Sequence, residues 1–184
     1  MLLIGWGNIQ AEPEAIFDGK SLKGWRVQGA PYWNARDGIL VGQSDGWMKN
    51  SVLWTEKSYA DFALEFDFRF TGDIDSGVFL REENFQIQIG ASRTLKRDMT
   101  GSPYVANQRG YAAEAQGISE LMRAGDWNRM RIIAKGGSYR VLLNDIKVME
   151  HETETHQPAG PLGLQVHPGV MMKIEFRDIQ IEET

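Results

Sequence analysis

The sequence has 184 residues, of which 42% are hydrophobic and 24% are charged, and its formal net charge is −5. This length is usual for one domain, and the lack of a basic cluster argues against nucleic acid as a partner. Cysteine is absent, which excludes disulfides, thiolate metal sites and thiol nucleophiles, and no apolar run reaches the roughly 18 residues of a transmembrane helix.

The first residues are apolar and end in a small residue, Ala11, before Glu12 and Pro13. They lack the basic stretch with which a signal peptide starts, and they are short for a complete one. We therefore assign residues 1–13 to a signal-peptide remnant, or to a disordered start or an extra edge strand. Residues 14–184 are assigned to a single domain.

Short apolar runs separated by glycine predict strands and turns along most of the chain. The clearest strand covers residues 61–70, where aromatic and aliphatic residues alternate with Ala63, Glu65, Asp67 and Arg69. A period of two places the apolar side chains on one face of a strand. The same pattern predicts further strands at residues 38–42, 51–55, 77–81, 85–89, 127–134, 138–143, 146–150, 160–167 and 171–182.

Two segments depart from this pattern. Residues 117–125 predict one or two helical turns, and residues 90–117 have weak periodicity and many polar side chains, which predicts a long functional or capping loop. About ten to twelve short strands without helical crossovers are typical of antiparallel sheets packed face to face. The sequence therefore predicts an all-β, two-sheet antiparallel sandwich of the jelly-roll type.

The alternation also predicts which side chains leave the core. In the predicted strands 85–89 and 160–167, apolar side chains alternate with Gln86, Gln88, Gln165 and His167. Arg81 and Asp67 fall on the outward faces of their own strands, so neighbouring strands would display all six as one polar surface. Such a surface is either simply solvated, or it binds a sugar through its amides, guanidinium and carboxylate.

A series of short motifs keeps one order from about residue 14 to residue 182. They are IFDGKSLKGW at 16–25, LWT at 53–55, FDFR at 66–69, DSGVFLR at 75–81, DWN at 126–128, LND at 143–145, GLQVH at 163–167 and FRDI at 176–179. In these motifs and their order the chain resembles the 3-keto-disaccharide hydrolase domain family.

The resemblance implies a concanavalin A-like jelly roll in an exported bacterial protein, periplasmic or secreted, whose partner is an oligosaccharide or glycoside. It implies cleavage of glycosides whose C3 hydroxyl has been oxidised to a ketone by a separate oxidoreductase. The ketone acidifies the C2 hydrogen, so a base can remove it, and the enolate then expels the group at C1; one base and one enolate stabiliser suffice. A non-catalytic carbohydrate-binding module on the same scaffold is the alternative.

The sequence departs from the family at two positions. Where the family's strand carries an outward glutamate this chain has Gln86, and where the family's central motif begins with asparagine it has Asp75. Because a glutamine amide cannot accept a proton at neutral pH, the chain either uses another base or binds without turnover.

Roles for the other candidates follow from the resemblance. His167 is the expected general base, since imidazole accepts a proton near neutral pH. Arg81 would stabilise the enolate, unless it only pairs with Asp67 on a neighbouring strand. Asp67 completes the expected catalytic set. With His167 it is also a candidate ligand for a divalent metal ion, although the chain contains only three histidines.

The substrate-binding residues are expected on the same surface. Gln86, Gln88 and Gln165 would orient hydroxyls, and Trp47 and Trp54 would stack on a sugar ring. The remaining aromatic and histidine candidates are assigned no role: Trp25, Trp33 and Trp127 are expected in the core, and His151 and His156 at the surface.

Overall fold

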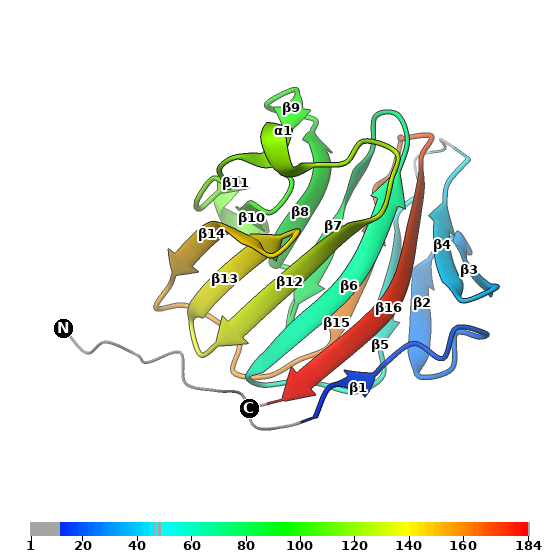
Figure 1. Ribbon diagram of the computed structural model, residues 1–184, viewed down its shortest axis with the longest axis horizontal. Helices are drawn as coiled ribbons and strands as arrows, with labels where there is room; N and C mark the ends of the chain where they lie inside the picture. The colour runs from blue at the N-terminus through cyan, green and yellow to red at the C-terminus, as the bar shows by residue number, and fades with distance from the viewer. Residues whose placement is uncertain (1–11, 46, 48, 184) are drawn as a thin grey trace.

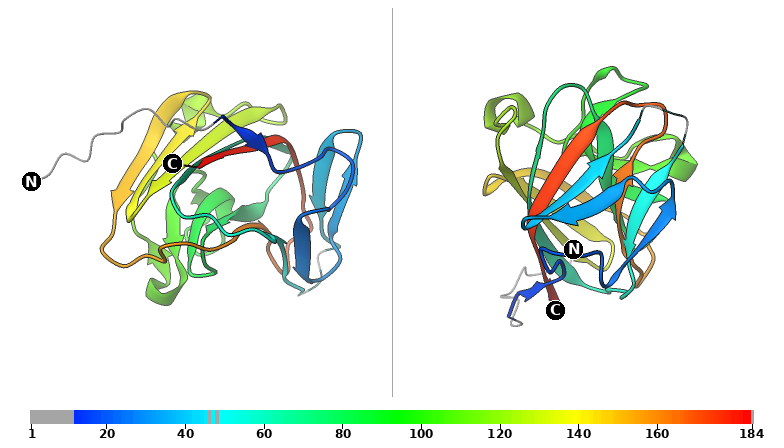
Figure 2. Two further views of the ribbon diagram at one scale, coloured as in Figure 1. Left: turned by 90° about the horizontal axis from the view of Figure 1, so that it is seen from below. Right: turned by 90° about the vertical axis from the view of Figure 1, so that its right-hand side faces the viewer.

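The computed structural model describes residues 12–45, 47 and 49–183, so most of the assignment for residues 1–13 lies outside the described residues. Two antiparallel sheets lie face to face (Figures 1 and 2). Sheet A has the order β14 (Ile146–Glu152), β13 (Ser138–Leu143), β12 (Asn128–Lys135), β6 (Phe62–Phe70), β16 (Lys173–Glu183), β4 (Ile39–Gln43) and β3 (Trp33–Arg36), and β1 (Glu14–Ala15) pairs with β16.

Sheet B forms the second layer, and β7 and β8 lie behind β6 and β12 in Figure 1. Its order is β11 (Gly110–Tyr111), β10 (Pro103–Val105), β8 (Phe85–Ser92), β7 (Asp75–Leu80), β15 (Leu162–Val166), β5 (Ser51–Thr55) and β2 (Trp25–Gly29), and β9 (Arg97–Asp98) pairs with β8. The described chain therefore has the predicted all-β sandwich architecture, and its only helices are η1 (Ala106–Gln108) and α1 (Ile118–Leu121). No described helix has the length and apolar character of a membrane span.

The core lies between the sheets and is filled by the alternating residues of the long strands. Phe62, Phe66 and Phe68 of β6 are each at most 1% exposed. Phe66 meets Phe176 of β16 edge-on, with ring centroids 5.7 Å apart. Such aromatic pairs stabilise a core beyond the area that they bury. The predicted inward face of residues 61–70 is thus confirmed up to Phe68; Phe70 at the strand end is half-buried.

Several segments differ from the sequence prediction. Residues 90–117 are not a single loop, because they contain the end of β8 and the short elements β9, β10, η1 and β11. Strands β2 and β3 were not predicted; they are short, and glycine-rich and polar residues flank them. Trp25 and Trp33 lie in the core as expected, whereas Trp127 is half-buried between the guanidinium groups of Arg69 and Arg177, 4.5 and 4.1 Å from its ring.

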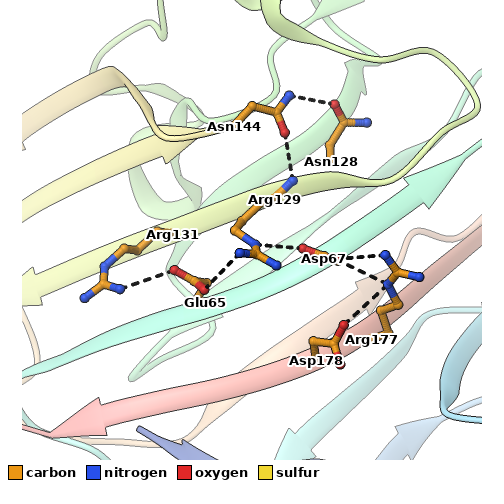
Figure 3. A network of polar contacts seen from close by, with 8 residues as sticks. All are labelled: Glu65, Asp67, Asn128, Arg129, Arg131, Asn144, Arg177 and Asp178. Atoms are coloured by element: carbon orange, nitrogen blue, oxygen red, sulfur yellow. Dashed lines mark hydrogen bonds and ion pairs between the residues drawn. The ribbon is translucent and has the colours of Figure 1, made fainter. Parts of the chain in front are cut away.

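Asp67 lies on the outward face of sheet A, so its predicted proximity to the outward residues of sheet B is wrong. The carboxylate accepts hydrogen bonds from Arg129 Nε at 3.0 Å and from Arg177 Nη2 at 3.1 Å, within a row of ion pairs across β12, β6 and β16 (Figure 3). The side chain is only 9% exposed. Alternation along one strand shows which face a residue takes but not which sheet the strand joins, and this is why the prediction failed.

Arg81 is buried, which corrects its predicted outward position. It follows β7 with a φ of 66°, and this left-handed conformation ends the alternation of the strand, so that the side chain turns inward. Its guanidinium donates to the carbonyl oxygens of Ala60 and Gly136, each at 2.7 Å, and to Asp61 Oδ1 at 3.2 Å. Arg81 therefore pairs with Asp61 rather than with Asp67, and it joins the end of β7 to the starts of β6 and β13.

We expect Arg81→Ala to lower the free energy of unfolding by about 3–5 kcal/mol, because it leaves buried carbonyl groups without their donor and removes the cation that pairs with Asp61. Arg36→Ala is the matched control, since the Arg36 side chain is 84% exposed and its loss should change stability by no more than about 0.5 kcal/mol. Urea denaturation of both variants measures the difference. Equal stability of the two variants would contradict a structural role for Arg81.

Candidate functional site

Three neighbouring strands of sheet B turn a set of polar residues away from the core. The pairing of β7 with β8 and β15 sets Gly77 beside both Gln88 and Gln165. The next outward position, Phe79, lies beside Gln86. Because Val78, Ile87 and Leu164 fill the core from the other face of these strands, the amides must lie on the outside of the sheet. The sequence pattern predicted this face for Gln86, Gln88 and Gln165, and the structure brings them together.

Glycine makes room for large side chains to lie flat on this surface. A Cβ at Gly77 would stand 2.7 Å from the carbonyl oxygen of Ile87 and would also collide with the Gln86 amide. A Cβ at Gly163 would stand 2.6 Å from the indole ring of Trp54. The two glycines therefore allow Gln86 and Trp54 to fold across neighbouring strands.

The amides hold one another and a carboxylate in place. Gln86 Nε2 donates to Gln165 Oε1 at 2.7 Å, and Gln88 Nε2 donates to Asp75 Oδ1 at 2.8 Å. Gln86, Gln88 and Asp75 are each at most 5% exposed. This is a layer of fixed, oriented hydrogen-bonding groups, and the remaining amide donors and acceptors can serve a ligand.

His167 stands at the end of β15, beside Asp75. Its Nδ1 lies 2.8 Å from the carbonyl oxygen of Pro168. Because a carbonyl oxygen only accepts hydrogen bonds, Nδ1 carries the proton, and in the neutral ring Nε2 keeps a free lone pair. Nε2 lies 3.9 Å from Asp75 Oδ2, and the same oxygen lies 3.5 Å from Arg93 Nε. The arrangement offers a proton acceptor, a carboxylate that would stabilise its protonated form, and a cation.

These side chains surround a pocket of about 300 Å³, a volume at the lower end of small-molecule sites. Its wall also includes residues from the stretch 90–117. The full lining comprises Asp75, Phe79, Glu83, Gln86, Gln88, Ser92, Arg93, Thr94, Tyr104, Ala106, Tyr111, Gln165 and His167.

Two tyrosines close the side of the pocket away from His167. Tyr104 and Tyr111 are paired across β10 and β11, and their rings meet edge-on with centroids 5.3 Å apart. Burial raises the pKa of the Tyr111 phenol, and the charge of nearby Asp75 raises it further, while a hydrogen bond with Ser92 opposes the shift. The Tyr111 hydroxyl therefore keeps its proton at neutral pH and can act as a donor in the pocket.

Four of the predicted site residues do not line this pocket. Arg81 and Asp67 lie elsewhere, as described above. Trp54 is 3% exposed and stacks on Phe79 at a centroid distance of 5.5 Å, so it supports the pocket wall instead of facing a ligand. Trp47 is 68% exposed, and its carbonyl oxygen accepts a hydrogen bond from Gly169, close to the turn that holds His167.

Several lining residues were missed as candidates by the sequence reasoning. The same alternation would place Asp75 on the outward face if the predicted strand 77–81 began two residues earlier. From the sequence, Asp75 was noted only as a departure from the family. Phe79 was placed opposite the core but given no role. Tyr104 and Tyr111 lie where the periodicity is weak, and no sequence signal identified them.

The predicted divalent metal site lacks a suitable set of ligands. The described residues contain no group of three or more histidine, aspartate or glutamate side chains arranged to hold an ion. The expected pair is separated, since His167 belongs to sheet B and Asp67 to sheet A. The carboxylate that does lie beside His167, Asp75, already contacts Gln88 and Arg93. A guanidinium at this carboxylate disfavours a second cation, so we derive no step through a metal.

Comparison with known proteins identifies relatives of this fold. A family model described as 3-keto-alpha-glucoside-1,2-lyase-like domain matches residues 12–182, in agreement with the resemblance found in the sequence motifs. No curated protein matches the chain significantly.

Solved structures share the jelly roll at low sequence identity. Two proteins of Parabacteroides distasonis assigned as glycosyl hydrolases superpose with TM-scores of 0.71 and 0.69, at 18% and 23% identity. Each comparison covers 94% of this chain, and 94% and 100% of the respective relative. The carbohydrate-binding module CBM66 of Bacillus subtilis superposes with a TM-score of 0.64 at 17% identity, covering 87% of this chain and 96% of the module.

We expect Gly77→Ala to displace Gln86 and to break its hydrogen bond with Gln165. The new methyl group should lower the free energy of unfolding by about 1–3 kcal/mol, and it should shift the side-chain amide resonances of both glutamines in an ¹⁵N NMR spectrum. Gly24→Ala is the control: its φ of +83° is unfavourable for alanine, unlike that of Gly77, but no atom lies within 4 Å of a new Cβ, so the amide resonances of Gln86 and Gln165 should stay unchanged. Unchanged amide resonances in Gly77→Ala would contradict the role of this glycine.

Proposed function

Because this chain belongs to the family of 3-keto-alpha-glucoside-1,2-lyase-like domains, we propose that it cleaves a 3-keto-α-glucoside in the pocket on the outer face of sheet B. The observation that carries this proposal is the position of His167. Its Nε2 has a free lone pair beside the carboxylate of Asp75, within a pocket lined by buried amides.

The reaction begins with removal of the C2 proton. His167 Nε2 accepts it, and the resulting imidazolium is stabilised by the negative charge of Asp75. The electron pair moves to the C3 ketone oxygen and forms an enolate. Arg93, whose Nε lies 3.5 Å from Asp75 Oδ2, is the cation in the pocket that can stabilise this oxygen, the role first assigned to Arg81.

The second step breaks the bond between C1 and the glycosidic oxygen. The enolate electron pair forms a double bond between C1 and C2 as the leaving group departs. In an α-glucoside the C2 hydrogen and the C1 oxygen lie on opposite faces of the ring, so water protonates the departing oxygen and His167 returns its proton to solvent. The products are an alcohol and an unsaturated 3-keto sugar, and together they contain all the atoms of the substrate. Addition of water across the double bond would make the net reaction a hydrolysis.

The departure at Gln86 is consistent with this scheme. Gln86 hydrogen-bonds Gln165 and needs no charge for that contact. The carboxylate of the pocket is instead on the adjacent strand, at Asp75, where it faces His167. Asp75 acts through the imidazole, and we therefore regard it as a positioning residue.

A carbohydrate-binding module is the second candidate function. The observation that favours it is the set of three amides, Gln86, Gln88 and Gln165, which bind hydroxyls without any chemistry. The two candidates differ in one measurable respect, the release of the aglycone from a 3-keto-glucoside.

We expect His167→Ala to lower kcat for a synthetic 3-keto-α-glucoside by about 10²- to 10⁴-fold, the usual contribution of a general base, with partial rescue by added imidazole. Its affinity for the unoxidised glucoside should stay within about threefold of wild type, because the amides remain. His151→Ala, in β14 of the other sheet, is the control and should keep wild-type turnover. Saturable binding by wild type without any aglycone release would establish the module and refute the enzyme.

We expect Asp75→Asn to lower kcat by about 10- to 100-fold, because the imidazolium of His167 loses the negative charge that stabilises it, with KM changed by less than about threefold. The matched control is Asp73→Asn, because Asp73 contacts the same Arg93 from a position that is 70% exposed. A purely structural role for Asp75 would instead change stability and KM together. Steady-state kinetics with the same substrate separate these outcomes.

A further inference from the structure

A second pocket adjoins the first beyond the two tyrosines. It has a volume of about 460 Å³ and lies between the loop after β8 and the β10–β11 hairpin. Four residues, Ser92, Thr94, Tyr104 and Tyr111, line both pockets, so the two spaces share a wall.

The chemistry of the second pocket differs from that of the first. The first is lined mainly by amides, two carboxylates, a guanidinium and an imidazole. The apolar part of the second lining consists of Leu95, Met99 and Ala113 together with Tyr104 and Tyr111. Leu95 is 45% exposed, one of the few large apolar side chains among the described residues that reach solvent. Aromatic rings, leucine and a methionine thioether are the groups that bind a flat apolar ligand.

Two exposed charged residues, Arg109 and Glu114, also line this pocket. Arg97 and Glu114 form a bidentate ion pair, with Nη2 of the arginine 2.8 Å from Oε2 of the glutamate. The partners neutralise each other, and the pair raises the pKa of Arg97 and lowers that of Glu114, so both stay charged near neutral pH. A ligand in the pocket therefore meets no net charge from this pair.

We infer that the second pocket binds the aglycone of the substrate and that it selects aromatic aglycones. The inference rests on the proposed function, since it takes the sugar to occupy the first pocket. Strands β15 and β8 are two strand spacings apart, roughly 10 Å, which accommodates one hexose ring. With C2 next to His167, the group on C1 extends across β8 toward Tyr104 and Tyr111, and an aromatic aglycone would enter the space beyond them.

The test compares benzyl and methyl 3-keto-α-glucosides. Benzyl alcohol and methanol have similar acidity, so a difference between the substrates reports contacts of the aglycone and not the quality of the leaving group. We expect wild type to show a kcat/KM about tenfold higher for the benzyl substrate, the gain from partial burial of one ring. Leu95→Asp should reduce this ratio to about one while the methyl substrate keeps its wild-type kcat/KM within about twofold.

Binding measurements make the result independent of catalysis. The dissociation constants of unoxidised benzyl and methyl α-glucosides, measured by calorimetry, should differ in the same direction and should become equal in Leu95→Asp. The matched control is Ile146→Asp, which places the same charge at a 54% exposed apolar residue of sheet A and should preserve the preference.

The outcomes separate the two proposals. Tighter binding of the benzyl glucoside without any turnover would support the aglycone pocket and overturn the catalytic proposal. Turnover with equal kcat/KM and equal affinity for both glucosides would overturn the aglycone pocket and leave the catalytic proposal standing. A benzyl preference that survives in Leu95→Asp would also overturn the assignment to this pocket.

Discussion

The burial of one guanidinium sets the geometry on which the candidate site depends. Arg81 ends β7 in a left-handed conformation and binds carbonyl oxygens from the start of β6 and from the turn between β12 and β13. A buried cation is tolerated only where its donors find acceptors, so this residue fixes where β7 stops. The backbone of Arg81 also lies directly against Gly160, where any Cβ would collide with its carbonyl group. The registers of β7 with β8 and with β15 follow, and these registers place Gln86, Gln88 and Gln165 around Gly77.

Alternation in the sequence was enough to predict which side chains of a strand point outward, but not which strands lie next to one another. It correctly turned Gln86, Gln88, Gln165 and His167 outward, because the apolar residues between them must enter the core. It could not assign Asp67 to the other sheet, since strand order depends on contacts between segments far apart in the chain. Arg81 was placed wrongly because the period of two holds only while φ stays extended, and the residue's own conformation breaks it.

The remaining errors have local physical causes. Trp54 was expected to face a ligand, but the absence of a side chain at Gly163 lets its ring lie flat against the sheet and stack on Phe79. The pocket wall from Tyr104 to Tyr111 was missed because its strands have two or three residues each, too few to show a period. The motif resemblance identified the family, whereas the alternation pattern alone favoured a solvated face over a sugar site.

The outer faces of the two sheets explain why we place the proposed ligand site on sheet B. On sheet A, Asp67 is held by two arginines, and a ligand there would have to displace charge-assisted hydrogen bonds that are already satisfied (Figure 3). On sheet B, the bond between Gln86 and Gln165 joins neutral groups and contributes only about 1 kcal/mol. A sugar hydroxyl both donates and accepts, so it can replace such a contact at little cost. The side chain of His167 remains 37% exposed at the edge of this layer, where its free nitrogen can reach a bound molecule. Binding followed by proton transfer requires amides whose hydrogen bonds are easily exchanged and an imidazole that a ligand can reach. The outer face of sheet B provides both, whereas the polar groups described on the outer face of sheet A are held in ion pairs.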